Sequence, residues 1–279
     1  MQGRFAFFNG QIVPIEDAKI SVRTHALNYG TGCFVEITLD LLRHEGYETD
    51  AYIRPLAYKA DEVIGVRLHN LTDGLAIFAT PFGRYVEAEE GARVMVSSWR
   101  RIDDNMIPAR GKITGAYINS AFAKTEALRN GFDEAIVLNA NGHVSEGSAE
   151  NIFVVRHGVV STPPVTDNIL EGITREVVIE LCRDVLHTTV EERSIDRSEL
   201  YVADEIFFTG TGVQIAAIVE VDERRIGTGA MGPVVRQLRD LYFDVVRGRV
   251  ARYRHWCTPV YATTMPAAAA LAEAAAVTP

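Results

Sequence analysis

The stretch Pro108-Ala-Arg-Gly-Lys-Ile-Thr-Gly-Ala-Tyr117 carries the most information about this chain. It places Lys112 just before a helical pattern that covers residues 116–129 and opens with the apolar pair Ala116 and Tyr117. Lys112 is therefore expected at an element boundary that faces inward, where desolvation would lower the pKa of its amine. Such an amine can act as a nucleophile. The alternative is the common one for a lone lysine after Arg-Gly, a solvated surface charge.

A carboxylate follows in Ser145-Glu-Gly-Ser-Ala-Glu-Asn-Ile-Phe153. Glu146 comes after the hairpin signal Asn141-Gly142 and before a very apolar strand, where a buried carboxylate needs a partner. A protonated ring nitrogen would be such a partner. The simpler alternatives are that Glu146 caps backbone N–H groups in a turn and that Tyr117 is a core aromatic.

Two further motifs fit the binding of a phosphate or carboxylate. Leu170-Glu-Gly-Ile-Thr-Arg175 opens a helix predicted over residues 173–186, and helix N-termini bind anions. The turn Thr209-Gly-Thr-Gly212 follows a strand predicted over residues 205–209. Each motif alone is weak, because many helices begin with Gly or Thr and most Gly-rich turns are only turns.

The order of these four motifs, from Lys112 to Gly212, resembles the branched-chain aminotransferases, members of the class IV (fold type IV) pyridoxal-phosphate enzymes. The resemblance implies pyridoxal 5'-phosphate as cofactor, with Lys112 forming a Schiff base to its aldehyde. It also implies that Glu146 holds a proton on the pyridine nitrogen and that Tyr117 hydrogen-bonds the phenolate oxygen. The cofactor phosphate would meet Ile173, Thr174 and Thr211, and the substrate carboxylate would meet the amides of Thr211 and Gly212.

Substrate recognition is expected in Tyr52-Ile-Arg-Pro55. Tyr52 and Arg54 are two residues apart, so on a strand both side chains point to one face. By resemblance, Arg54 meets the distal carboxylate of 2-oxoglutarate or glutamate; the alternative is an exposed arginine on a surface strand. The resemblance also assigns an apolar substrate pocket to aromatic residues that would otherwise be read as core, namely Tyr29, Phe34 and Trp99.

Composition narrows the class of protein. The chain has 279 residues, 47% of them hydrophobic, and a net charge of -9, which argues against nucleic acid as a partner. We find no signal peptide and no membrane span, so a cytoplasmic location without membrane association is expected. The three cysteines are far apart and odd in number, which indicates neither a disulfide framework nor a metal site.

The predicted architecture is α+β, a two-domain fold of the D-amino-acid-aminotransferase type. Residues 1–98 are expected to form a small α+β domain with a helix over residues 35–44. An interdomain loop is expected at 99–108, a large β-rich cofactor domain at 109–257, and a disordered tail from residue 258, which is poor in large apolar groups.

One departure from the family pattern follows Phe34. Family members continue there with Glu-Gly and some tens of residues that include an arginine on the cofactor phosphate, whereas here Phe34 runs directly into Val35-Glu-Ile-Thr-Leu. The resemblance therefore implies an incomplete small domain and a missing phosphate arginine.

The function expected from the resemblance is transamination of leucine, isoleucine or valine with 2-oxoglutarate. Glutamate and branched-chain 2-oxo acids are the other small-molecule partners, in a homo-oligomer built from dimers. The alternatives are a catalytically impaired or non-catalytic shortened form, or another class IV member such as D-amino-acid aminotransferase or aminodeoxychorismate lyase. Tyr52-Ile-Arg-Pro55 and Trp99 favour the branched-chain member.

Overall fold

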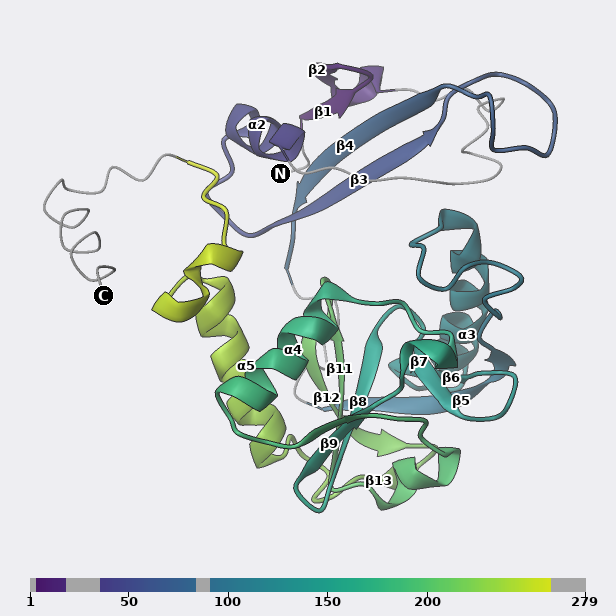
Figure 1. Cartoon of the computed structure of the whole chain (residues 1–279), viewed down its shortest axis with the longest axis vertical. Coiled ribbons are helices and arrows are strands. Elements are labelled where there is room, and N and C mark those ends of the chain that lie inside the picture. The colour runs from purple at the N-terminus through teal and green to yellow at the C-terminus, as the bar shows by residue number, and fades with distance from the viewer. Residues whose placement is uncertain (1–3, 19–35, 84–90, 262–279) are drawn as a thin grey trace, which may run out of the picture.

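A computed structural model describes residues 4–18, 36–83 and 91–261, which form two sheets with helices packed on them (Figure 1). The smaller sheet has the strand order β2-β1-β4-β3 and is antiparallel throughout. Its elements are β1 (Phe5–Phe8), β2 (Gln11–Pro14), the short 3-10 helix η1 (Ile15–Asp17), α2 (Glu36–Glu45), β3 (Ala51–Lys59) and β4 (Asp73–Pro81).

Alternation along β4 explains how α2 covers this sheet. Ile77 and Ala79 point to one face and are buried, whereas Phe78 between them is largely exposed. On the amphipathic helix α2, Leu41 and Leu42 are buried. Helix and sheet thus share one small core, and β3 is the edge strand that lies toward the larger sheet (Figure 1).

The larger sheet has nine strands, in the order β10-β9-β8-β11-β12-β5-β6-β7 with β13 paired to β12. The pairings of β5 with β6 and β12 are parallel, as is that of β9 with β10; the other pairs are antiparallel. Its strands are β5 (Ala92–Arg100), β6 (Glu134–Leu138), β7 (Val144–Gly147), β8 (Asn151–Arg156), β9 (Val159–Thr162), β10 (Val190–Glu192), β11 (Glu205–Gly210), β12 (Gln214–Val221) and β13 (Arg224–Arg225). The helices of this part are η2 (Thr114–Ala116), α3 (Tyr117–Arg129), η3 (Val165–Asp167), α4 (Ile173–Asp184), η4 (Arg197–Val202), α5 (Pro233–Val246) and η5 (Ala251–Trp256).

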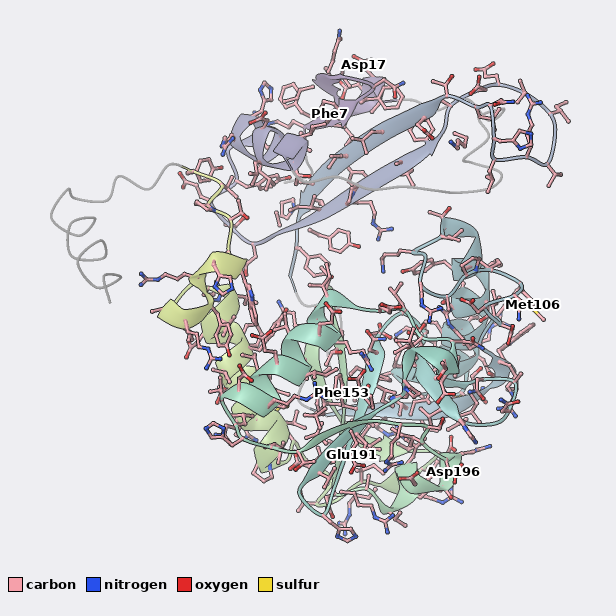
Figure 2. All side chains as sticks on the ribbon, viewed as in Figure 1. Phe7, Asp17, Met106, Phe153, Glu191 and Asp196 are labelled. Carbon is pink, nitrogen blue, oxygen red and sulfur yellow. The ribbon has the colours of Figure 1, made fainter. Side chains whose placement is uncertain are left out.

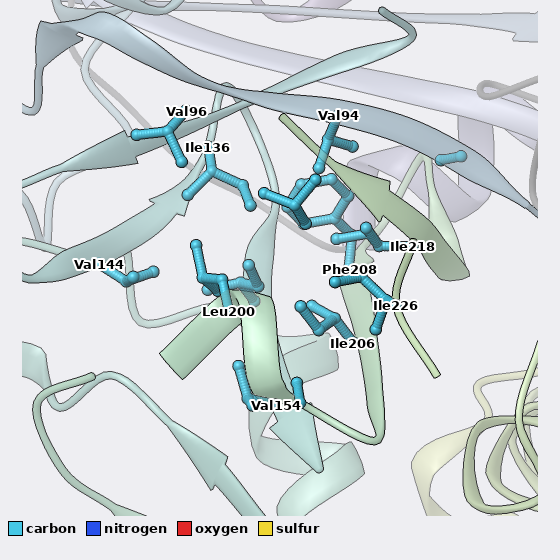
Figure 3. Close-up of a cluster of buried hydrophobic side chains, with 14 of the residues drawn as sticks. Val94, Val96, Ile136, Val144, Val154, Leu200, Ile206, Phe208, Ile218 and Ile226 are labelled. Atoms are coloured by element: carbon cyan, nitrogen blue, oxygen red, sulfur yellow. The ribbon is translucent and has the colours of Figure 1, made fainter. Parts of the chain in front are cut away.

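Three apolar clusters hold the large sheet together. The first lies between its two halves, where Val94 and Ile136 share one core with Phe208 and Ile218, so the sheet curls around it (Figure 3). On the other face α4 and α5 cover a second cluster that contains Phe153, labelled in Figure 2, stacked on Phe207 at 5.0 Å. A third, smaller cluster packs α3 on β5 and β6.

The expected boundary at residues 98–99 is wrong. Residues 92–100 form β5, a central strand of the large sheet in which Ala92, Val94 and Val96 alternate into its core. The two sheets divide between Pro81 and Ala92, and the connection expected at 99–108 begins only after Arg100. The strands and helices expected elsewhere in the described ranges agree with the structure to within a few residues at their ends.

The tail was expected to be disordered from residue 258, and for residues 258–261 this is wrong. The Tyr261 hydroxyl donates to the Tyr47 carbonyl at 2.7 Å, and Arg43 of α2 donates to the Val260 carbonyl. These bonds fix the segment against the small sheet. Residues 262–279 lie outside the described ranges. Within those ranges, no helix has the length and apolar character that a membrane span requires.

Candidate active site

Glu146 lies on β7 with its side chain almost completely enclosed, at 4% exposure. Arg101 Nη2 is 2.9 Å from one carboxylate oxygen. The Asn151 side-chain amide and the Leu170 backbone N–H donate to the other at 3.2 and 3.0 Å. Burial raises the pKa of Glu146 to about 7, against the lowering effects of Arg101, the Leu170 N–H and the charge of Lys112. The carboxylate is therefore fixed in place and close to its titration point at neutral pH.

Lys112 and Tyr117 come together beside this carboxylate. The Lys112 ammonium lies 5.4 Å from the centre of the Tyr117 ring, and its charge acts on Glu146. The inward, desolvated position expected for Lys112 is wrong, because its side chain is exposed. The apolar face of α3 also differs from the expected one. Tyr117 is partly exposed, and the buried positions are Ser120, Ala123 and Ala127, because it is these that meet β5 and β6.

The start of α4 is close to Glu146. Gly172 is the N-cap residue and makes no side-chain cap hydrogen bond, so the first amides of α4 lack the usual side-chain acceptor. A Cβ atom on Gly172 would overlap the side-chain amide oxygen of Asn151, so the helix end packs closely against that side chain. Thr174 is buried and Ile173 is exposed. An anion could reach the free amides here.

The turn between β11 and β12 lies at the same end of the sheet. Thr209 on β11 pairs with Asn151 on β8, and the following turn carries the exposed Thr211 and the half-buried Gly212. The Thr209 hydroxyl is fully buried and has no hydrogen-bond partner. A buried hydroxyl without a partner is costly and calls for a ligand or water.

An ion pair joins the two loops that carry the amine and the helix start. Arg110 Nε, two residues before Lys112, is 2.7 Å from a carboxylate oxygen of Glu171, which precedes Gly172. Met106 lies at the rim of the loop before Lys112 (Figure 2) and is exposed. The structure thus brings Lys112, Tyr117, Glu146 and the start of α4 into one region.

Tyr52 and Arg54 lie on one face of β3, as expected. Arg54 Nη2 donates to the Tyr52 hydroxyl at 2.7 Å, and the guanidinium lies 5.1 Å from the centre of the Tyr52 ring. The Phe82 ring contacts the Tyr52 ring in a tilted arrangement, with the ring centres 5.0 Å apart. Trp99 stacks on Phe122 of α3 at 4.6 Å and is otherwise exposed, and its place in a substrate pocket remains a prediction. Tyr29 and Phe34 lie outside the described residues.

Sequence reasoning missed Arg101, the role of Asn151 and the buried Thr209. Asn151 stands in the quoted motif, and the apolar strand after it could have directed attention to its amide. Nothing in the sequence distinguishes Arg101 from Arg100, because only the backbone path after β5 turns one of them toward Glu146. Arg101 Nε also donates to the Asn168 carbonyl at 3.1 Å, which fixes its guanidinium.

A family model for amino-transferase class IV matches residues 26–221. The chain belongs to the class IV aminotransferases. A probable branched-chain-amino-acid aminotransferase of Aquifex aeolicus is 46% identical over 301 positions, which cover 92% of this chain and 97% of the relative. An alignment longer than this chain means that the relative has residues with no counterpart here.

Solved structures share the whole architecture of this class IV aminotransferase. The branched-chain aminotransferase of Thermoproteus uzoniensis, crystallised with norvaline, superposes with a TM-score of 0.87 at 38% identity and covers 92% of this chain and 99% of its own. The branched-chain amino acid aminotransferase of Thermobaculum terrenum in its PLP form gives 0.85 at 34% identity, with 94% and 99% covered. The two-domain α+β fold type IV architecture is confirmed.

The residues of this aminotransferase fit pyridoxal phosphate. Lys112 offers an amine, and Glu146 offers a buried carboxylate near it whose pKa of about 7 suits a shared proton. The start of α4 offers uncapped amides, and Thr209 a buried hydroxyl without a partner. These groups could meet the aldehyde, the ring nitrogen and the phosphate of the cofactor.

Proposed function

We propose that this class IV aminotransferase transfers the amino group of leucine, isoleucine or valine to 2-oxoglutarate, giving branched-chain 2-oxo acids and glutamate, with pyridoxal 5'-phosphate as cofactor. The observation that carries the proposal is the buried Glu146 carboxylate, held by Arg101 within reach of the charge of Lys112. Relatives named as branched-chain aminotransferases, and a solved relative in its PLP form, support the substrate class and the cofactor.

Four groups of this chain would hold the cofactor. Lys112 would bind its aldehyde and Glu146 its ring nitrogen, while Tyr117 would meet the ring oxygen. The amides of Ile173 and Thr174 and the turn at Thr211 would bind its phosphate. When bound, pyridoxal phosphate supplies an aldehyde that takes up amino groups and a ring that withdraws electrons from the carbon next to them.

Lys112 has two tasks in this proposal. Its amine would hold the cofactor at the aldehyde and, when free, would accept the proton that leaves the substrate Cα. The exposed side chain of Lys112, flexible at its four methylenes, suits a group that must detach and move.

Glu146 would hold a proton at the ring nitrogen of bound pyridoxal phosphate. A carboxylate whose pKa lies near neutrality shares that proton without releasing it, and Arg101 with the Leu170 N–H keeps both oxygens in position. The Asn151 side-chain amide donates both to this carboxylate and to the Leu170 carbonyl, and so connects the carboxylate to the segment just before α4. These hydrogen bonds would fix the ring-nitrogen end of the cofactor relative to its phosphate end.

Arg54 and Tyr52 account for the use of both apolar and acidic substrates. Their bond leaves other guanidinium donors on Arg54 for a distal carboxylate, which suits 2-oxoglutarate and glutamate.

The homo-oligomer built from dimers and the cytoplasmic location remain predictions from the sequence. The shortened, catalytically impaired form also remains open, because the alignment with the Aquifex aeolicus relative supports a missing segment. The position expected for it, after Phe34, lies outside the described residues.

The test of the proposed function is to locate the amine that binds the cofactor. Borohydride reduction after addition of pyridoxal phosphate should attach it to Lys112, as found by peptide mapping, and the Lys112→Ala variant should show no attachment and no transamination. Lys59→Ala serves as the matched control, since Lys59 pairs with Asp73 on β4. Attachment to Lys19, Lys59 or Lys124 in the unaltered chain would overturn the assignment.

A further inference from the structure

The C-terminal segment, residues 257–261, runs from η5 to the small sheet (Figure 1). The Tyr261 hydroxyl donates to the Tyr47 carbonyl at 2.7 Å and lies 3.3 Å from the Leu42 carbonyl in the last turn of α2. Tyr47 belongs to the α2–β3 turn, residues 46–50, which connects that helix to β3. The segment therefore contacts the small sheet just before the strand that carries the expected substrate residues.

The end of α5 holds the α2–β3 turn at a second point. Arg247, the C-cap residue of α5, has its Nη2 atom 3.0 Å from a carboxylate oxygen of Asp50, the last residue of the turn. The Cys257 thiol lies 3.4 Å from the Val245 carbonyl of α5, so the C-terminal segment also begins at this helix end. Both attachments thus join the α2–β3 turn to the end of α5.

These attachments restrict how the small sheet can move. The chain connects the two sheets between Pro81 and Ala92, and units joined by one connection normally move relative to each other. Contacts at the α2–β3 turn oppose such a rotation, because it would separate Tyr47 and Asp50 from α5. Since β3 is an edge strand, paired along one side, its start depends on these contacts more than an inner strand would.

The attached turn leads directly to the residues expected to bind the distal carboxylate. The Phe82 N–H donates to the Asp50 carbonyl at 3.1 Å, and the rings of Phe82 and Tyr52 have their centres 5.0 Å apart. The Tyr52 hydroxyl in turn accepts from Arg54 at 2.7 Å. These contacts form a continuous path from Arg247 on α5 to Arg54 on β3.

We propose that Tyr261 and Arg247 are positioning residues that hold the start of β3 in place, so that Arg54 can bind the distal carboxylate of 2-oxoglutarate or glutamate. The choice of substrate rests on the proposed function. An ion pair between exposed side chains contributes little to stability, and the side chains of Arg247 and Asp50 are 47% and 70% exposed. Loss of these contacts should therefore alter selectivity more than folding.

Hydrogen exchange in the cofactor-free chain tests the placement of β3 without any activity. The double variant Arg247→Met/Tyr261→Phe should exchange the amides of residues 46–56 faster, whereas the amides of α4 and α5 stay protected. Unchanged exchange at residues 46–56 would overturn the inference.

Arg249→Met/Tyr253→Phe is the matched control. Arg249 forms a similarly exposed ion pair at 3.0 Å, but with Asp244 of the same helix, and the buried Tyr253 hydroxyl has no hydrogen-bond partner within the described part of the chain. Exchange at residues 46–56 should match that of the unaltered chain. An equal increase in both double variants would overturn the inference, because a general loosening around α5 would then explain it.

Transamination rates test the selectivity. In Arg247→Met/Tyr261→Phe, the ratio of kcat/KM for 2-oxoglutarate to kcat/KM for 4-methyl-2-oxopentanoate should fall roughly two- to tenfold, the value of one hydrogen bond. The affinity for pyridoxal phosphate should stay unchanged. A merely structural role would lower both kcat/KM values alike and leave their ratio intact, and that result would overturn the inference.

A double-mutant cycle tests the route through Arg54. Once Arg54→Ala has removed the positioned residue, Arg247→Met should leave the ratio of the two kcat/KM values unchanged. A further fall would show that Arg247 acts by another route and would refute the inference. If borohydride attached no cofactor to Lys112, the proposed function would fall, while the exchange measurement would still decide whether Tyr261 and Arg247 hold β3.

Discussion

At the scale of single residues, the proposed cofactor site depends on the charge state of Glu146. Burial alone favours the neutral acid, and the guanidinium of Arg101 and the Leu170 N–H oppose it. The sequence identified Glu146, because an acid before a very apolar strand needs a partner. It could not identify Arg101, since the partner is chosen by the path of the backbone after β5.

Glu146→Gln separates cofactor binding from chemistry. The amide keeps the shape and can still accept one hydrogen bond from Arg101, so pyridoxal phosphate should still bind. It cannot hold the ring nitrogen protonated, and turnover should fall on the order of a hundredfold or more. Absorbance titration and single-turnover rates measure the two effects. Glu176→Gln, an exposed site on α4, should change neither. Normal turnover in Glu146→Gln would remove Glu146 from the chemistry.

Arg54→Ala tests substrate selection. Only 2-oxoglutarate brings a second carboxylate that would be left unpaired, so kcat/KM for 2-oxoglutarate should fall more than that for an apolar oxo acid such as 4-methyl-2-oxopentanoate. The variant loses the hydrogen bond from Arg54 to Tyr52 whichever oxo acid is used. The ratio of the two kcat/KM values therefore does not depend on that loss. Equal losses for both oxo acids would show that Arg54 only supports β3.

At the scale of elements, periodicity predicted which segments are strands and helices but not always the sheet to which a strand belongs. The alternation of Ala92, Val94 and Val96 indicates a strand, yet only the parallel pairing with β6 and β12 assigns it to the large sheet. Helix α3 shows the same limit. Its small residues Ala123 and Ala127 face the sheet because they allow close approach, which leaves Tyr117 at the rim.

The turn between β7 and β8 contains a second buried acid that predicts a pH dependence of stability. Burial and the nearby charges of Glu134 and Glu146 raise the pKa of Glu150 to about 8, opposed by the Ala149 N–H and Lys124. A raised pKa means that the folded chain binds more protons than the unfolded chain between pH of about 4.5 and about 8. The free energy of unfolding, measured with urea in the cofactor-free chain, should therefore fall as pH rises through that window.

Glu150→Gln should flatten this dependence, because the amide does not titrate. Glu146 would still contribute to the pH dependence of the free energy of unfolding, but only up to its own pKa of about 7. Glu223→Gln on the exposed β12–β13 turn provides the matched control and should leave the slope unchanged. A slope equal in the unaltered chain and in Glu150→Gln would show that Glu150 is not the titrating group.

At the scale of the whole molecule, every predicted cofactor contact lies in the part of the chain that contains the large sheet, and the small sheet carries Tyr52 and Arg54. The motif order predicted this division of tasks from the sequence. The boundary between the sheets was placed too late in the chain, because the acidic, glycine-flanked run between β4 and β5 was not used as the division. The segment expected after Phe34 belongs to the small domain, and family resemblance assigns an arginine on the cofactor phosphate to it.

Loss of that segment should weaken cofactor binding. A charge-assisted hydrogen bond contributes roughly 1.5–3 kcal/mol, so the chain should bind pyridoxal phosphate about tenfold to a hundredfold more weakly than the Aquifex aeolicus relative. Fluorescence titration of both purified proteins, with their masses verified, measures the ratio. Insertion of the relative's segment after Phe34 should restore most of the affinity, whereas the same insertion with its arginine changed to methionine should not. Equal affinity of the two proteins would show that the start of α4, with Thr174 and Thr211, binds the phosphate sufficiently without an arginine.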